Sequence, residues 1–343
     1  MINLFNRRAR HHNLNALRIA LVSDELTFAC LKQECHLVSI TPLNYRSVLC
    51  YWKPDILLVE SAWKGKRESW KYKIAAYPDH PKRNNSVLAN VVSHAKNLGI
   101  PTVFWNKEDS VHFDRFIDSA VLFDYIFTVD ENAVPRYRER VDAAVPVNTL
   151  MFSAQSKIHN FTGFDFKYNR ANFVGSYSHH IHDKRRTYQD VLFSAASSTE
   201  LGLTVFDRNS SRKSANYRYP AIPGIEVMPS VPYEQTAQIY KDYLVSLNVN
   251  TVVNSATMFS RRLVEIIACG GIAVTTPAVS VDCVFSDYCY VVSNEDETKE
   301  LFHRLKHGPT SDDFERARAG SEYVLQHHTW SHRLEEIARV VEV

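Results

Sequence analysis

The sequence is short of glycine, with only 10 glycines in 343 residues, and it contains neither a G-x-G-x-x-G run nor a G-x-x-x-x-G-K-[ST] run. Those loops let backbone amides approach phosphates in dinucleotide-binding folds and P-loop NTPases, so their absence disfavours both classes. The six cysteines include no C-x-x-C pair. We expect them to be reduced and buried, as in a cytosolic protein.

Neither sign of charge dominates, because 40 Lys and Arg residues face 38 Asp and Glu residues, for a formal net charge of +2. Any anion site therefore has to be local, and no nucleic-acid-binding surface is expected. No apolar run approaches the ~20 residues that span a bilayer. Residues 1–17 form a basic N-terminal tail that we expect to be frayed, with contact to an anionic membrane as the alternative. The predicted location is cytoplasmic, free or at the inner face of the membrane.

Short β-branched runs alternate with stretches of helical period, a pattern typical of α/β proteins, and the length suggests about two domains. We expect strands at residues 18–23, 36–40, 55–60, 102–106, 125–129, 172–176, 203–207, 244–250 and 272–276. A polar and aromatic segment at 153–169 interrupts this rhythm. We therefore predict an N-terminal domain at 18–165 and a C-terminal domain at 166–343, each with a predominantly parallel sheet.

The stretch from Asn248 to Gly271 carries the strongest chemical signal, because a buried strand ends in a polar loop before a helix that begins near Ser260. A helix N-terminus offers unpaired N–H groups to an anion. Nearby hydroxyls and arginines suited to phosphate are Ser255, Thr257, Ser260, Arg261 and Arg262. Glu265 on this apolar helix needs partners, and ribose hydroxyls are suitable ones. An ordinary capped helix with a solvated Arg/Glu pair explains the same residues.

Polar residues also follow two strands of the N-terminal half, where an open parallel sheet places ligand contacts. Candidates for a base that deprotonates a hydroxyl are Asp109, Glu108 and His112. Other candidate contacts are Asp24, Glu25, Glu60, Trp63 and Lys107. Asp24 and Glu25 compete for the role of base, and Trp63 is suited to stacking on a sugar ring. The structural alternatives are that Asp109 caps a helix and that Glu60 pairs with Lys107.

A third polar group follows the strand at 203–207 and contains Asp207, Arg208, Asn209, Tyr217 and Arg218. It suits contacts with a nucleotide base or a sugar, and a solvated loop explains it equally well.

The run T-M-F-S-R-R-L-V-E-I-I-A-C-G-G at 257–271 resembles the donor-site motif R-x-F-E-x-x-A-C-G of the CgeB-like glycosyltransferases, which are related to the group 1 glycosyltransferases of GT-B fold. His328, Thr329, Trp330 and Arg333 are similar to that family's closing H-T-[YW]-x-x-R. Further similar segments are LVSDELT, PDILLVESAWKG, PTVFWNKEDSVHF, FDYIFTVDENAVPRYR and FVGSYS. The resemblance therefore covers nearly the whole chain in order.

The resemblance implies two facing Rossmann-like domains with a cleft between them, a nucleotide sugar on the C-terminal domain and an acceptor on the N-terminal one. It implies that Arg262 contacts the diphosphate and that Glu265 contacts the ribose. It also implies that the backbone at Gly175 and Ser176 approaches the phosphates closely. It also implies terminal helices that cross back to the first domain. The predicted partners are a nucleotide sugar and a glycan or glycoconjugate acceptor, with no separate cofactor.

Two positions depart from the family pattern, since Thr257 stands where many retaining relatives carry a second glutamate, and Val264 replaces the usual phenylalanine. The donor sugar and the stereochemistry stay open. The chain has no D-x-D, so we expect a metal-independent enzyme that stabilises its leaving diphosphate with arginines and a helix dipole. The alternatives are a polyol-phosphate transferase on the same scaffold and a catalytically silent assembly protein.

Overall fold

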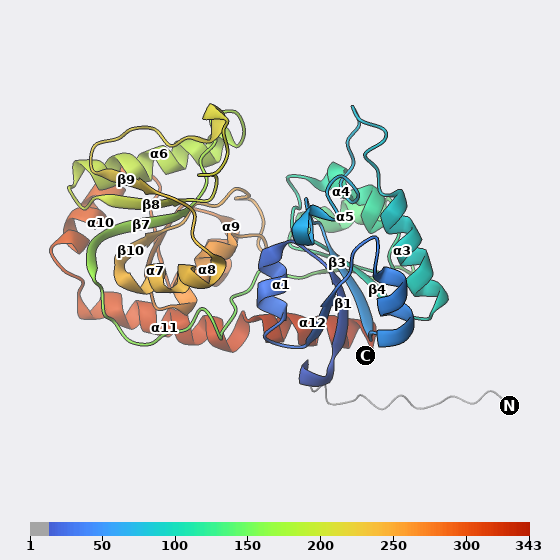
Figure 1. Cartoon of the computed structure of the whole chain (residues 1–343). Helices are drawn as coiled ribbons and strands as arrows, with labels where there is room; N and C mark the ends of the chain where they lie inside the picture. The colour runs from blue at the N-terminus through green and yellow to red at the C-terminus, as the bar shows by residue number, and fades with distance from the viewer. Residues whose placement is uncertain (1–13) are drawn as a thin grey trace. The chain divides into compact units, whose positions relative to one another are not determined.

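The computed structural model describes residues 14–343, so most of the predicted N-terminal tail lies outside the described residues. The chain forms two compact units (Figure 1). The described part of the first unit comprises residues 14–151 and Trp330–Val343, and the second comprises Phe152–Thr329. The segment 152–165, which the sequence assigned to the first domain, thus belongs to the second unit, and the last helix belongs to the first.

The first unit is built on a six-stranded sheet in the order β2-β1-β3-β4-β5-β6, and every pairing is parallel. Its strands are β1 (Arg18–Val22), β2 (His36–Ser39), β3 (Ile56–Glu60), β4 (Thr102–Asn106), β5 (Tyr125–Thr128) and β6 (Val147–Thr149). Its α-helices are α1 (Glu25–Leu31), α2 (Tyr45–Ser47), α3 (Ser86–Asn97), α4 (Phe113–Ala120), α5 (Val134–Arg138) and α12 (Trp330–Val341). β3 and β4 are buried at every position, as central strands covered on both faces are.

The second unit holds another parallel six-stranded sheet, in the order β12-β11-β10-β7-β8-β9. Its strands are β7 (Tyr168–Gly175), β8 (Leu203–Asp207), β9 (Ile225–Met228), β10 (Tyr243–Leu247), β11 (Ile272–Thr275) and β12 (Tyr290–Val291). Its helices are α6 (Asp183–Ser198), α7 (Thr236–Asp242), α8 (Arg261–Ala268), α9 (Val279–Val284), α10 (Glu295–Lys306) and α11 (Ser311–His327). α6 and α10 pack on one face of the sheet, and α7, α8 and α11 on the other (Figure 1).

The nine predicted strands all exist, and three further strands, β6, β9 and β12, were not predicted. Each of the three lies at the outer edge of its sheet. An edge strand buries little, so it lacks the continuous apolar run that identifies a central strand. The cysteines differ from the expectation that all are buried, because Cys283 is exposed and Cys35 and Cys50 are only partly buried; none of the six is in a disulfide.

Residues of the closing motif form contacts close to the two points where the chain passes from one unit to the other. In the first unit, the Arg333 Nε donates to the Met151 carbonyl at 2.8 Å, and the rings of Trp330 and Trp105 meet edge to face. In the second unit, Thr329 pairs with Ala154 in an isolated parallel bridge. These residues are therefore structural in this conformation.

Candidate functional site

The second sheet has a change of direction between β7 and β10. From β7 the chain adds β8 and β9 on one side, and it then adds β10, β11 and β12 on the other. Ligands bind beyond the carboxyl ends of parallel strands at such a switch point. A pocket of about 180 Å³ lies there. It is lined by Phe152, Ser176, Arg185, Arg208, Val249, Thr251, Val252, Met258, Phe259, Ser260 and Arg262.

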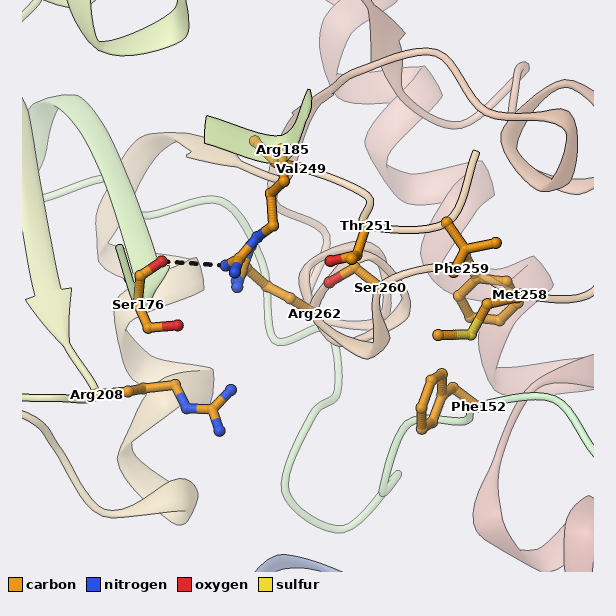
Figure 2. A pocket seen from close by; sticks show the side chains of 11 residues that line it. Phe152, Ser176, Arg185, Arg208, Val249, Thr251, Met258, Phe259, Ser260 and Arg262 are labelled. Atoms are coloured by element: carbon orange, nitrogen blue, oxygen red, sulfur yellow. Dashed lines mark hydrogen bonds between the residues drawn. The ribbon is translucent and has the colours of Figure 1, made fainter. Parts of the chain in front are cut away.

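Three guanidinium groups line this pocket, and none of its 11 described lining residues is acidic (Figure 2). Arg185 comes from α6, Arg208 from the loop after β8, and Arg262 from the first turn of α8. The Arg185 Nη2 donates to the Ser176 carbonyl at 3.1 Å, and the Arg208 amide donates to the Gly175 carbonyl at 2.9 Å. Three cations converge here from three elements, an arrangement suited to an anion with several oxygens.

Arg262 is buried and held in one orientation. Its Nε donates to the Val174 carbonyl at 2.5 Å, and its guanidinium lies 4.3 Å from the centre of the Phe173 ring. Burial lowers its pKa to about 10, so it stays protonated at neutral pH. Gly175 is required beside it, because a Cβ there would lie 2.8 Å from Arg262 Nη2 and 2.5 Å from Phe173 Cε1.

The loop before α8 is shaped by its own side chains. The Ser255 Oγ accepts from the amides of Thr257 and Met258 at 3.2 and 3.0 Å, and Asn250 Oδ1 accepts from the Ser260 amide at 2.9 Å. Ser260 lines the pocket, whereas Ser255 and Thr257 do not. Of the seven predicted donor-site residues, Ser176 and Arg262 therefore line the pocket, and Gly175 packs against Arg262.

Glu265 and Arg261 form a second group on α8. The Arg261 Nε donates to Glu265 Oε1 at 2.9 Å, and the Tyr233 hydroxyl donates to the same oxygen at 3.0 Å. The Glu265 side chain is only 5% exposed and that of Arg261 21%, so the pair is largely buried and differs from the solvated surface pair that was the alternative. Neither residue lines the pocket.

In the first unit, a buried ion cluster lies at the carboxyl ends of β1, β3 and β4, where the strand order also reverses. The Lys107 Nζ lies 2.9 Å from Glu60 Oε1 and 3.5 Å from Asp24 Oδ2. Burial by itself would lower the pKa of Lys107, but Glu60 and Asp24 outweigh it and raise that pKa. Burial raises the pKa of Glu60. The predicted alternative that Glu60 pairs with Lys107 is confirmed.

Asp24 organises the loop after β3. Its carboxylate accepts from the backbone amides of Trp63, Lys64 and Gly65 at 3.2, 3.2 and 2.8 Å. Burial would raise the pKa of Asp24, yet Lys107 and these amides lower it overall, so the group stays ionised. Glu25, by contrast, is an exposed residue at the first position of α1.

Asp109 is fully buried and satisfied by neighbours. Its Oδ1 accepts from Asn106 Nδ2 at 2.8 Å, and its Oδ2 accepts from the hydroxyls of Thr128 and Tyr137, both at 2.7 Å. Its exposed fraction is 0%, and burial raises its pKa to about 7. In this conformation it cannot touch a ligand, whereas Glu108 and His112 are partly exposed. The His112 ring packs edge to face on Trp63 at 5.2 Å.

The elevated pKa of Asp109 predicts a pH-dependent stability. Because the folded-state pKa of about 7 lies above the unfolded value, folding retains a proton that the unfolded chain releases. Asp109 therefore stabilises most below about pH 4, and the contribution, up to about 4 kcal/mol, is lost as the pH rises through about 7. Asp109→Asn should remove this component from the urea-unfolding curve, so the stability difference from the native protein shrinks with rising pH. A difference that stays constant from pH 4 to 8 would contradict the assignment. All five tryptophans lie in the first unit, so their fluorescence follows it.

Sequence reasoning missed Arg185 as a pocket residue. It belongs to the run D-K-R-R at the start of α6, and the neighbouring Arg186 bonds the Ser178 carbonyl and Asp183 instead. The basic run was a signal, but only the helix orientation decides which arginine lines the pocket. For Arg208 the sequence allowed two interpretations, a ligand contact or a residue of a solvated loop, and in the structure Arg208 lines the pocket.

Residues 14–343 contain neither a candidate metal site nor a candidate membrane-spanning helix. Three or more His, Cys, Asp or Glu side chains do not gather there in any group that could hold a metal ion. Over the same residues, every helix falls short of the length and apolar character that a membrane crossing demands.

Comparisons with known proteins agree with this architecture. Residues 185–339 match the model of a family described as "Glycosyl transferase-like". No curated protein matches the chain. The matched segment contains most of the pocket-lining residues and the whole of α8.

Solved structures share the fold at low sequence identity. An α-glucosyltransferase in complex with UDP and a DNA containing a HMU base has a TM-score of 0.61 at 12% identity, over 96% of this chain and 100% of that one. HepE from Anabaena, in complex with UDP and glucose, has a TM-score of 0.56 at 10% identity, over 92% and 88%. Sucrose-phosphate synthase from Thermosynechococcus elongatus has a TM-score of 0.52 at 9% identity, over 88% and 76%. The chain therefore has the two-domain α/β GT-B fold.

Proposed function

We propose that the protein is a CgeB-like glycosyltransferase that moves a sugar from a nucleotide sugar to a hydroxyl of a cell-surface glycan or glycoconjugate precursor. The observation that carries this proposal is the pocket of the second unit, where Arg185, Arg208 and Arg262 converge at the switch point of the sheet. A diphosphate is the anion that three guanidinium groups fit best. The similar proteins of known structure include two in complex with UDP.

The diphosphate would bind in this pocket, with Gly175 giving room for its approach, and the ribose hydroxyls would donate to Glu265. The guanidinium groups would stabilise the negative charge that develops on the leaving diphosphate, which makes a metal ion unnecessary in this proposal. A cytoplasmic location, free or at the inner face of the membrane, is part of the same proposal.

The acceptor would bind in the first unit above the cluster of Asp24, Glu60 and Lys107. A base has to reach the acceptor hydroxyl, so the partly exposed Glu108 and His112 are better placed than the buried Asp109. Trp63, which His112 holds edge to face, would contact the acceptor sugar.

A thermal-shift screen tests the donor assignment, with UDP first and then GDP, ADP, CMP, CDP and dTDP. A nucleotide at ~100 times its Kd stabilises by about 2.7 kcal/mol, which raises the melting temperature by several degrees. Pyrophosphate, which has no ribose, is the second ligand. Glu265→Gln should weaken the nucleotide about tenfold and leave pyrophosphate binding unchanged.

The matched control is Glu322→Gln, an exposed glutamate on α11, which should change neither shift. If no nucleotide stabilises the native protein, the donor-site proposal fails and the silent assembly protein becomes the better hypothesis. If Glu265→Gln weakens pyrophosphate as much as the nucleotide, Glu265 supports the pocket and does not contact the ribose. Turnover of the stabilising nucleotide's sugar conjugate then tests the transferase activity.

A further inference from the structure

The long connection between β3 and α3 in the first unit concentrates positive charge. Residues 64–83 contain seven basic and two acidic side chains, a net charge of +5, whereas the whole chain has +2, so the rest of the chain is negative by 3. The basic residues are Lys64, Lys66, Arg67, Lys71, Lys73, Lys82 and Arg83. We call these seven residues the basic loop cluster.

Little of this charge is neutralised by carboxylates. Glu68 pairs with both Lys64 and Lys71, at 2.9 and 2.8 Å. Within the described part of the chain, the other five cations of the cluster form no ion pair. Cations gathered without counter-charges repel one another and attract a ligand that carries repeated negative charge.

Aromatic rings hold part of the cluster in place. Tyr72 and Tyr77 pack edge to face at 5.2 Å, and the guanidinium of Arg83 lies 4.2 Å from the Tyr72 ring centre and 5.8 Å from that of Tyr77. Arg115 of α4 lies 5.8 Å from the Tyr77 ring. These ring contacts fix the position of Arg83 and offset its repulsion from Arg115.

The exposure of the loop's apolar and aromatic side chains indicates which kind of anionic ligand fits. Trp70, Ile74 and Ala75 are buried, so the loop has almost no large apolar side chain to insert into a lipid surface. Tyr72 is 37% exposed, but Arg83 lies over its ring, which makes the ring a poor platform for a nucleic-acid base. A flexible chain with regularly spaced carboxylates or phosphates meets neither obstacle.

The loop is anchored to the ion cluster where the acceptor is proposed to bind. The backbone amides of Lys64 and Gly65, at the start of the loop, donate to Asp24 at 3.2 and 2.8 Å, and Asp24 lies 3.5 Å from Lys107. We propose that the acceptor is an anionic polysaccharide, whose charged chain binds along the basic loop cluster. This inference rests on the proposed transferase function, whose acceptor class it names.

Binding of fluorescein-labelled polygalacturonate, measured by anisotropy on the full chain, tests the proposal, with labelled dextran as the neutral counterpart. The native protein should bind polygalacturonate, more weakly as salt rises, and should not bind dextran. Changing Lys66, Arg67 and Lys82 together to Gln should weaken binding at least about tenfold. The matched control changes the exposed Lys53, Lys213 and Arg318 to Gln and should leave it unchanged.

An equal loss in both triple variants would overturn the proposal, because it would indicate attraction to net charge alone. Equal or tighter binding to phosphatidylserine vesicles or to single-stranded DNA would also overturn it, in favour of a membrane or a nucleic acid. The thermal shift that UDP produces, measured in both triple variants, tests the donor assignment separately from the acceptor class. A UDP shift without polygalacturonate binding contradicts only the acceptor class, and polygalacturonate binding without any nucleotide shift contradicts only the donor assignment.

Discussion

Arg262→Lys is expected to weaken the binding of a nucleoside diphosphate by about a hundredfold, or about 2.7 kcal/mol. The planar guanidinium bonds the Val174 carbonyl and Asn248 Oδ1 and stacks on Phe173, and it also lines the pocket. A lysine ammonium keeps the charge, but it cannot make these contacts at once. Isothermal titration with the nucleotide found in the thermal-shift screen measures the change, and pyrophosphate should be weakened as well.

The matched control is Arg186→Lys, which lies beside Arg185 on α6 but bonds Ser178 and Asp183 away from the pocket. It should change affinity less than about twofold. Because Arg262 is buried, its replacement also affects folding, so Arg185→Ala serves as a second variant with a milder structural role. Undiminished affinity in both Arg262→Lys and Arg185→Ala would show that the phosphates bind elsewhere.

The second large effect concerns stability, since Lys107→Met is expected to destabilise the first unit by about 3–5 kcal/mol. Lys107 is the cation 2.9 Å from the Glu60 carboxylate, whose side chain is only 1% exposed. Its removal leaves a buried carboxylate without its counter-charge. Urea unfolding followed by tryptophan fluorescence measures the loss, because all five tryptophans lie in this unit.

The double variant Lys107→Met with Glu60→Gln should recover a large part of the loss, because no uncompensated charge then remains. Lys107→Met by itself should be least destabilised at low pH, where Glu60 takes up a proton. The control Lys64→Met breaks an exposed pair with Glu68 and should cost far less, because solvent screens that pair. A cost for Lys107→Met no larger than this would contradict the buried-pair assignment.

The strands show what local sequence predicts. β3 and β4 are mostly apolar and buried at every position, so their sequences predicted strands directly. β9 has the sequence I-E-V-M with three exposed positions, and β12 has two residues, so neither carries a signal of its own. These edges form because a neighbouring strand offers unpaired backbone groups, which is a property of the assembled sheet.

The candidate site shows the same division. The motif around α8 predicted ligand contacts for Arg262 and Glu265, which stay predictions, and the structure shows that both side chains are buried with specific partners. It did not predict that Arg261 would pair with Glu265, or that Ser255 would brace the loop. Helical spacing allows both outcomes, and only the surroundings of α8 select one of them.

The amino-acid sequence by itself determined the α/β class, the central strands, the succession of two α/β units and the cationic helix start at Arg262. These follow from periodicity and residue chemistry, which are local. The tertiary structure decided that Arg185 and Arg208 join Arg262 in one pocket and that Asp109 is enclosed by Asn106, Thr128 and Tyr137. Each of these joins residues far apart in the chain, and such contacts depend on strand order and helix packing that no local pattern encodes.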